Sequence, residues 1–308
     1  MQDSPVKIRD LILFSFFSFM IIFFVFLSTF FDERTKIVFC DVGQGDGAYI
    51  RIKNKVDVLI DAGPDKKILS CLGRYMPFWD RKIELIFISH NQKDHFGGLN
   101  YILDRYQIGT VFLVNDLNAS LQSFKRLKEK IINKKVKIEE ALAGKIIQAV
   151  QLRQLDEARF TMIWPIRNLN SSNDNDFSNV LLFECCRGAI YSAQTFRVLF
   201  TGDASPFVLS RLSQPVGVLR AKPLQYIDIL KIPHHGSKNG LTKKFLDLAD
   251  PKIAVISVGK NNSYGHPHQK ILDMLKAKNI KIRRTDEEGD IVFEVKTQKA
   301  KVKNESQN

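Results

Sequence analysis

Two histidines and an aspartate lie close together in a short polar segment that directly follows an apolar run. The run ends at Ile88, and His90, Asp94 and His95 follow within the segment Ser-His-Asn-Gln-Lys-Asp-His-Phe-Gly-Gly. Neutral imidazoles and carboxylates are common ligands of zinc, manganese and iron. A metal that keeps one coordination position open can deliver hydroxide near neutral pH. The segment therefore predicts a divalent-metal site with hydrolytic chemistry.

Two later motifs carry the same kinds of side chain, and each also follows an apolar run. Asp203 stands in Thr-Gly-Asp after the run that ends at Phe200, and His234 and His235 follow the run 228–232. Short apolar runs of this kind are typical of buried strands. Because several strand ends can converge at one edge, we expect these residues to share one metal site.

Length and composition indicate one large globular domain with an appendage, or at most two domains, in a chain of 308 residues that is 44% hydrophobic and 26% charged. The appendage is the uncharged, Phe-rich run 11–31, which is long enough to cross a hydrocarbon layer of about 30 Å. We predict a single transmembrane helix. A cleaved signal peptide is the alternative, but the run is long and no small-x-small cleavage site precedes Asp32.

The charges that flank the span favour, slightly, an extracytoplasmic domain. Lys7 and Arg9 precede the span, and Asp32 and Glu33 follow it. The net charge of +13 predicts attraction to polyanions such as nucleic acid or anionic lipid. The alternative is a set of solvated lysine-rich faces, which is how we interpret the basic side chains of the helix expected at 121–133.

The four cysteines, at positions 40, 71, 185 and 186, form no metal-binding motif. We expect buried thiols, with one disulfide possible if the domain lies outside the cytoplasm.

Hydrophobic periodicity predicts strands first and then alternating strands and helices. Strands are expected at 36–42, 48–52, 58–61, 85–89, 111–114, 180–185, 196–200, 229–232 and 253–258. Helices are expected at 65–75, 97–106, 121–133, after Pro206, at 242–248 and at 267–277. Residues 280–284 and 291–295 predict a closing hairpin. The order fits a layered α/β domain with two central sheets. We divide the chain into an anchor, 1–34, a hydrolase domain, 35–296, and a basic disordered tail, 297–308.

Six ordered motifs resemble the hydrolase-like domain of the ComEC competence proteins, which lies in the metallo-β-lactamase superfamily. The segment with His90, Asp94 and His95 has the spacing of the superfamily's His-x-His-x-Asp-His loop. The six motifs are Asp41–Asp46, Leu59–Pro64, Asn175–Leu181, Phe200–Asp203, His234–Ser237 and Tyr264–Pro267. The resemblance covers roughly residues 36–295.

The resemblance implies an αββα sandwich, here preceded by one transmembrane helix, with one or two divalent ions, zinc or manganese, at one edge of the sheets. His90 would ligate a first ion, Asp94 and His95 a second, and Asp203 both. The full set of implied ligands is His90, Gln92, Asp94, His95, Asp203, His234 and His235. Of the last two histidines, one would complete the second site.

The chain departs from the family's pattern at two points. Gln92 stands where the superfamily has His and ComEC-type domains often have Asp. Its amide oxygen carries no charge, so we expect weaker metal binding at the first site. The chain also lacks the many-helix channel that accompanies this domain in full-length competence proteins, which points to a separate membrane channel protein as a partner.

Several other motif residues are expected to support the metal ligands, to take part in catalysis or to contact the substrate. Asp46 and Asp61 would hold the ligands through hydrogen bonds, with turn capping as the alternative. His266 would donate a proton or bind substrate phosphate, or it is a turn residue. Besides His266, the expected catalytic residues are Asp94, His234 and His235. The residues expected in the substrate cleft are Asn175, Ser178 and Ser237.

Three functions fit these features. The first is a membrane-anchored metal-dependent phosphodiesterase or nuclease that acts on DNA, single-stranded DNA included, during uptake. The second is a non-catalytic DNA-binding module of an uptake apparatus, which the neutral Gln92 suggests. The third is an envelope phosphodiesterase or esterase with a small substrate, because one fold serves many reactions.

Overall fold

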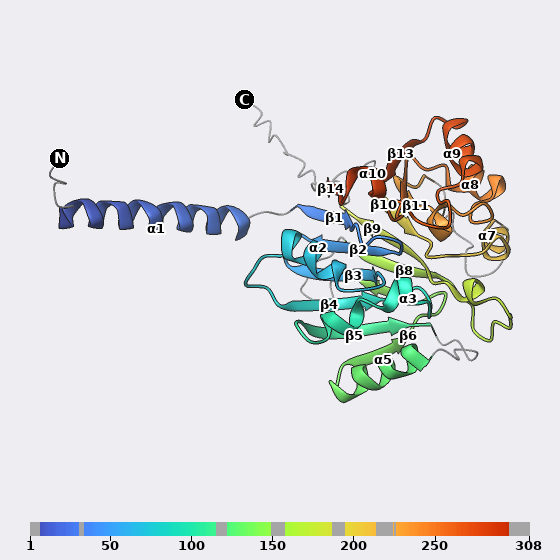
Figure 1. The fold of residues 1–308 in the computed structure, drawn as a ribbon, viewed down its shortest axis with the longest axis horizontal. Helices are drawn as coiled ribbons and strands as arrows, with labels where there is room; N and C mark the ends of the chain where they lie inside the picture. The colour runs from blue at the N-terminus through green and yellow to red at the C-terminus, as the bar shows by residue number, and fades with distance from the viewer. Residues whose placement is uncertain are drawn as a thin grey trace, which may run out of the picture.

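The computed structural model describes residues 7–30, 34–114, 122–148, 158–186, 195–213, 224 and 226–295. It consists of one N-terminal helix, α1 (Ile8–Phe30), and a two-sheet domain that begins at β1 (Thr35–Phe39) (Figure 1). Residue 31 of the predicted span and the predicted tail, 297–308, lie outside the described residues.

The first sheet has the strand order β14-β1-β2-β3-β4-β5-β6. β1 and β2 run antiparallel to their neighbours, whereas β3, β4, β5 and β6 are parallel to one another. Its other strands are β2 (Gly47–Ile52), β3 (Val56–Ala62), β4 (Lys82–Phe87), β5 (Gln107–Leu113), β6 (Lys137–Glu140) and β14 (Ile291–Val295).

The second sheet has the order β13-β12-β11-β10-β9-β8-β7. Strands β10 to β13 are parallel, and β7, β8 and β9 pair antiparallel. The strands are β7 (Ile146–Gln148), β8 (Arg159–Trp164), β9 (Val180–Cys185), β10 (Phe196–Phe200), β11 (Ile229–Lys231), β12 (Ile253–Ile256) and β13 (Lys281–Arg284).

Three apolar cores hold four layers together. Alternate side chains of a strand face opposite sides, so in β1 Ile37 and Phe39 pack between the sheets while Val38 packs under the helices of the first sheet. Phe39 meets Phe200 and Phe87 meets Phe160 across the central layer, with ring centroids 5.6 and 5.3 Å apart. A separate core lies between the second sheet and its helices. The αββα sandwich is confirmed.

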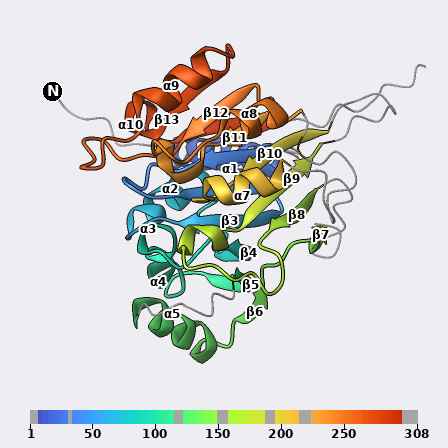
Figure 2. The same cartoon turned by 90° about the vertical axis from the view of Figure 1, so that its right-hand side faces the viewer.

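Short helices cover the outer faces of both sheets (Figure 2). On the first sheet lie α2 (Lys67–Tyr75), α3 (Lys93–Phe96), α4 (Leu99–Ile102) and α5 (Gln122–Asn133). On the second lie α7 (Pro206–Leu212), α8 (Lys243–Ala249) and α9 (Gln269–Lys276). The remaining turns are α10 (Thr285–Glu288), η1 (Asp174–Phe177) and η3 (Pro233–Gly236).

The predicted closing hairpin is wrong. β13 joins the second sheet as a parallel neighbour of β12, and β14 joins the first sheet beside β1. The helical turn α10 separates the two strands, and Thr285 anchors it by exchanging hydrogen bonds with the backbone of Val258. Each strand has the expected extent, but its apolar pattern does not say which sheet it will complete.

The expectation of buried thiols fails for two cysteines. Cys40, at the end of β1, forms a disulfide with Cys71 of α2, so the bond ties the first sheet to a covering helix. Cys185 and Cys186 are buried in the core between the sheets and take no part in that disulfide.

Candidate metal centre

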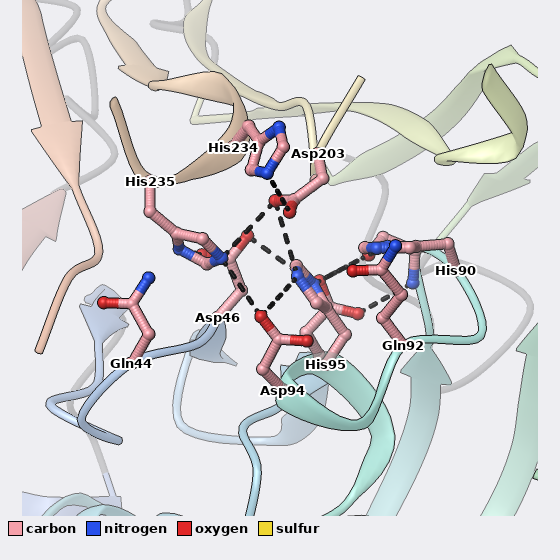
Figure 3. A network of polar contacts seen from close by, with 12 residues as sticks. Gln44, Asp46, His90, Gln92, Asp94, His95, Asp203, His234 and His235 are labelled. Carbon is pink, nitrogen blue, oxygen red and sulfur yellow. Dashed lines mark hydrogen bonds and ion pairs between the residues drawn. The ribbon is translucent and has the colours of Figure 1, made fainter. Parts of the chain in front are cut away.

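The predicted ligands meet at one edge of the sandwich, where parallel strands of both sheets end. β4 leads through His90 into α3, which carries Asp94 and His95, whereas β10 leads to Asp203 and β11 leads to η3. Figure 2 views the domain from the end opposite α1, and Figure 3 shows these side chains pointing toward one another.

Four side chains can hold one metal ion. One ligand atom each from Asp94, His95, Asp203 and His235 lies within 4.8 Å of the others. His95 Nε2 is 3.4 Å from Asp203 Oδ1 and 3.7 Å from Asp94 Oδ2. His235 Nε2 is 3.4 Å from Asp94 Oδ2 and 3.6 Å from Asp203 Oδ1. A tetrahedron of ligands about 2.1 Å from an ion has edges of about 3.4 Å, so these separations fit a zinc-sized ion.

Neighbouring groups turn the free nitrogen of each imidazole toward the centre. Asp61 Oδ2 lies 2.9 Å from His95 Nδ1, and Ser257 O lies 2.8 Å from His235 Nδ1. Nε2 of both rings and Oδ1 of Asp203 are buried without a hydrogen-bond partner. Buried polar atoms are rarely left unpaired, so three such atoms facing one point fit a bound cation. Asp61 thus lies where the sequence predicted a supporting carboxylate.

The opposite charges of the centre shift one another's pKa. Burial opposes ionisation of Asp203, but His235, His95 and Lys231 hold its pKa well below the ordinary value. Burial likewise opposes protonation of His235, but Asp203 and Asp46 raise its pKa to about 10. The pKa of His95 is also raised, against burial, chiefly by Asp203 and Asp61. The two imidazoles therefore carry protons that a metal ion would displace.

Lys231 is a buried lysine beneath the centre that the sequence did not single out. Its ammonium forms an ion pair with Asp46, donates to the carbonyl of Gly202 at 2.9 Å and lies 3.8 Å from Asp203 Oδ1. Burial would raise the pKa of Asp46, but Lys231 and then His235 outweigh it and lower that pKa. Lys231 interrupts the apolar run 229–232. A lysine inside a strand expected to be buried indicates a buried acidic partner, and this pattern could have identified it.

The predicted first metal position is less complete. His90 is buried, and its Nε2 has no hydrogen-bond partner. Burial and then His95 lower the pKa of His90 to about 3. The Gln92 amide donates to Asn175 Oδ1 at 3.1 Å, and Asn175 Nδ2 lies 3.3 Å from His234 Nδ1. Gln92 therefore belongs to a chain of neutral polar groups beside the centre.

A cavity of about 400 Å³ opens over the centre. Three of its wall residues come from the metal cluster, and two others, Tyr264 and His266, come from the loop after β12. Its lining residues are Gln44, Pro64, Gln92, Lys93, Asp94, Asp203, His234, His235, Tyr264 and His266. Tyr264 is 65% exposed, and its ring stacks on that of His266 with centroids 5.6 Å apart. Burial and then His235 lower the pKa of His266 to about 4.

Three residues expected in the cleft lie elsewhere. Ser178 is fully buried, and its hydroxyl accepts a hydrogen bond from the backbone N–H of Asp203 at 3.2 Å. Ser237 ends η3, outside the cavity wall. Asn175 lies behind the wall, between Gln92 and His234. Ser178 thus supports the backbone of Asp203, and Asn175 supports the side chains of Gln92 and His234.

The double-histidine turn has an unusual backbone. His234 and His235 have φ angles of 51° and 52°, in the left-handed region that non-glycine residues seldom adopt. This conformation sends His235 into the centre and leaves His234 half-exposed, with Nε2 3.7 Å from Asp203 Oδ2. Of the two histidines, His235 is the one placed among the four ligand atoms.

Curated relatives match most of this chain. ComE operon protein 3 of Bacillus subtilis (strain 168) is 26% identical over 293 residues, which are 90% of this chain and 35% of the relative. Recombination protein 2 of Haemophilus influenzae is 26% identical over 282 residues, 89% of this chain and 31% of the relative. The chain is thus similar in sequence to competence and recombination proteins, in line with the resemblance that its motifs indicate. The chain spans about a third of the length of these relatives.

Solved structures share the fold of this chain at low identity. A metallo hydrolase from the archaeon Ignicoccus hospitalis has a TM-score of 0.51 at 14% identity, covering 85% of this chain and 100% of that one. A variant of CmlA β-hydroxylase has a TM-score of 0.52 at 14% identity, covering 85% of this chain and 54% of that one. No family model matches the chain. One fold thus accompanies two reaction types, so the reaction must be argued from the site.

Proposed function

We propose that this chain is a metal-dependent phosphodiesterase that cleaves DNA during uptake, anchored in the membrane by α1. The observation that supports it most is the cluster of Asp94, His95, Asp203 and His235, whose unpaired buried atoms face one point at the floor of an open cavity. Relatives named for competence and recombination favour DNA as the substrate, as does the net charge of +13.

A divalent ion in this cluster would act as a Lewis acid toward a phosphodiester and make water more acidic. The ion would be zinc or manganese, with a second ion held only weakly because Gln92 is neutral. Around it, Asp61 and the carbonyl of Ser257 fix the two imidazoles, and Lys231 offsets the charge of the carboxylates.

Two histidines of the cavity wall can serve the leaving oxygen. His234 and His266 both face the cavity, with ring centroids 6.0 Å apart. The pKa of each is lowered, first by burial, so each ring is neutral near pH 7 and can donate one N–H hydrogen bond to the leaving oxygen. Tyr264 stands beside His266 as an exposed ring on which an unpaired base could stack, which favours single-stranded DNA.

We place the domain outside the cytoplasm, with 1–34 as its anchor, 35–296 as the hydrolase unit and 297–308 as a tail. The apolar helix α1 is long and hydrophobic enough to cross a membrane. The disulfide between Cys40 and Cys71 supports an oxidising compartment, because such bonds are rare in the cytosol. A separate membrane channel protein would then receive the processed strand.

A phosphodiesterase assay of the full chain in detergent tests the proposal. We expect cleavage of single-stranded DNA that depends on Mn²⁺ or Zn²⁺ and is lost in Asp94→Asn. The matched control, Asp104→Asn, changes a half-exposed surface carboxylate and should keep activity. Binding should weaken as salt rises, because phosphate contacts release counterions. Absence of metal-dependent cleavage in the unaltered chain would overturn the proposal.

The second candidate is a DNA-binding module without catalysis, and the neutral Gln92 favours it, because its amide donates to Asn175 and its oxygen brings no charge to a metal ion. In that case the chain would bind single-stranded DNA with the same salt dependence and show no turnover with either metal. Gln92→Asp would then be the variant to test for recovered metal binding and cleavage.

A further inference from the structure

The link between α1 and the domain is too short to let the domain move far from the membrane. α1 ends at Phe30 and β1 begins at Thr35. The five Cα-to-Cα steps from one to the other reach at most about 18 Å when fully extended. If α1 spans the bilayer, the sheet edge that holds Thr35 must lie near the lipid headgroups.

The connection between α2 and β4 belongs to this same edge. Lys36 of β1 pairs with Arg51 of β2, and the Arg51 guanidinium binds Asp80 of the connection at 3.1 and 3.2 Å. β3 and β4 run in the same direction as β1, so their first residues also lie at this edge. Figure 1 shows the connection protruding on the side of α1, with α3 at the other end of the domain.

Two large aromatic side chains project from this connection. Phe78 is 79% exposed and Trp79 is 53% exposed, and their rings meet edge to face with centroids 4.9 Å apart. Exposed neighbouring aromatics of this size seldom occur on a surface without a binding role. Tryptophan in particular is enriched at the boundary between headgroups and acyl chains, because its ring is apolar and its N–H is polar.

Basic side chains flank the aromatic pair. Arg81 and Lys82 follow it after Asp80 and are exposed, and Lys55 is exposed in the turn between β2 and β3 at the same edge. The acidic groups nearby are already engaged, since Asp80 and Asp57 both bind Arg51 and the buried Glu84 lies 3.5 Å from the Lys82 ammonium. This leaves a positive rim around an apolar tip, which matches an anionic lipid surface.

We propose that Phe78 and Trp79 insert into the interface of the membrane that α1 crosses, with Arg81 and Lys82 on lipid phosphates. This inference rests on the proposed anchoring through α1. A lipid surface fits better than DNA here, because the metal centre lies at the carboxyl ends of the strands and this pair lies at their amino ends. The contact holds the catalytic edge facing away from the bilayer.

Tryptophan fluorescence of the full chain in vesicles tests the contact. The chain has two tryptophans, and Trp164 is buried with its N–H bonded to the carbonyl of Asp176. The difference between the unaltered chain and Trp79→Phe therefore isolates Trp79. In vesicles of phosphatidylcholine and phosphatidylglycerol at about 7:3, chosen to carry the anionic surface that attracts basic residues, we expect a blue shift and strong quenching by lipids brominated near the carbonyls. Acrylamide quenching should be lost.

Two controls separate this inference from the anchoring on which it rests. Resistance to carbonate extraction reports insertion of α1 by itself, and its failure would refute the anchoring. If the chain resists extraction while Trp79 stays open to acrylamide and unaffected by brominated lipid, the interfacial contact is refuted. Arg81→Gln with Lys82→Gln should reduce the quenching difference between anionic and neutral vesicles, and an unchanged difference would remove the phosphate contact from the proposal.

Discussion

Replacement of Lys231 by methionine would show how much the metal-free centre depends on a buried ammonium. The variant keeps most of the side chain's volume but leaves Asp46 and Asp203 facing each other without their shared cation. At 3.8 Å, the attraction between Lys231 and Asp203 alone is about 4 kcal/mol at an effective dielectric constant of about 20. Removal of one partner from a buried ion pair costs about 3–5 kcal/mol.

We therefore expect Lys231→Met to lower the free energy of unfolding by about 3–5 kcal/mol in the presence of a chelator. The measurement is urea unfolding of the full chain in detergent, followed by fluorescence. Lys252→Met is the matched control, because Lys252 pairs with Asp228 at 2.7 Å but is 68% exposed. An exposed pair of this kind contributes about 0–1 kcal/mol.

A metal ion should compensate for the lost ammonium. With less positive charge beneath the carboxylates, Mn²⁺ should bind Lys231→Met more tightly than the unaltered chain, and its stabilising effect grows with affinity. The reasoning is refuted if Lys231→Met and Lys252→Met lose equal stability, or if Mn²⁺ stabilises Lys231→Met no more than the unaltered chain.

Three further predictions concern the metal, the substrate and pH. Gln92→Asp should raise metal affinity and bring a second ion to the chain, which metal analysis would count; unchanged stoichiometry and affinity would show that position 92 is not a ligand. Tyr264→Ala should raise KM for single-stranded DNA about 5- to 100-fold, as expected for one lost base stack, but should leave KM for a small chromogenic phosphodiester unchanged. Tyr226→Ala is the control, because Tyr226 is also an exposed tyrosine. The pKa of His235 is raised to about 10, so in the presence of a chelator its contribution to the free energy of unfolding is complete below pH 6.5 and is lost between pH 6.5 and pH 10. The loss is up to about 1.4 kcal/mol per pH unit. If His235→Gln with a chelator shows the same slope of unfolding free energy against pH, this prediction is wrong.

Local patterns predicted a layered domain with two sheets and one edge that gathers the ligands, and the family resemblance added the αββα order. An apolar run followed by His90 or Asp203 indicates a buried strand with a polar residue at its end, and the fold brings such ends together. The pairing of strands far apart in the sequence has no comparable local pattern. The sequence therefore predicted, wrongly, that β13 and β14 form one hairpin. The edge strands β6 and β7 escaped prediction because they are short and largely exposed.

The details of the centre could be predicted only in part. Residue types identify Asp94 and His95 as possible ligands, but the left-handed turn decides that His235 and not His234 reaches them. Ser178 looked like a cleft residue because it is polar and lies in a polar loop, yet its hydroxyl serves the backbone of Asp203. Lys231 was overlooked because its neighbours in the strand are apolar, although a buried lysine always requires a partner.

The separation between the aromatic pair and the metal centre limits what can be hydrolysed. β3, from Val56 to Ala62, runs between the two edges, and the six steps of about 3.3 Å from its first to its last residue extend about 20 Å. A phosphodiester held within a headgroup of the same leaflet would have to leave the bilayer to reach Asp94 and His235. Polymers that thread past the domain, or small esters dissolved in the surrounding water, meet no such barrier, so phospholipids are poor candidates for turnover.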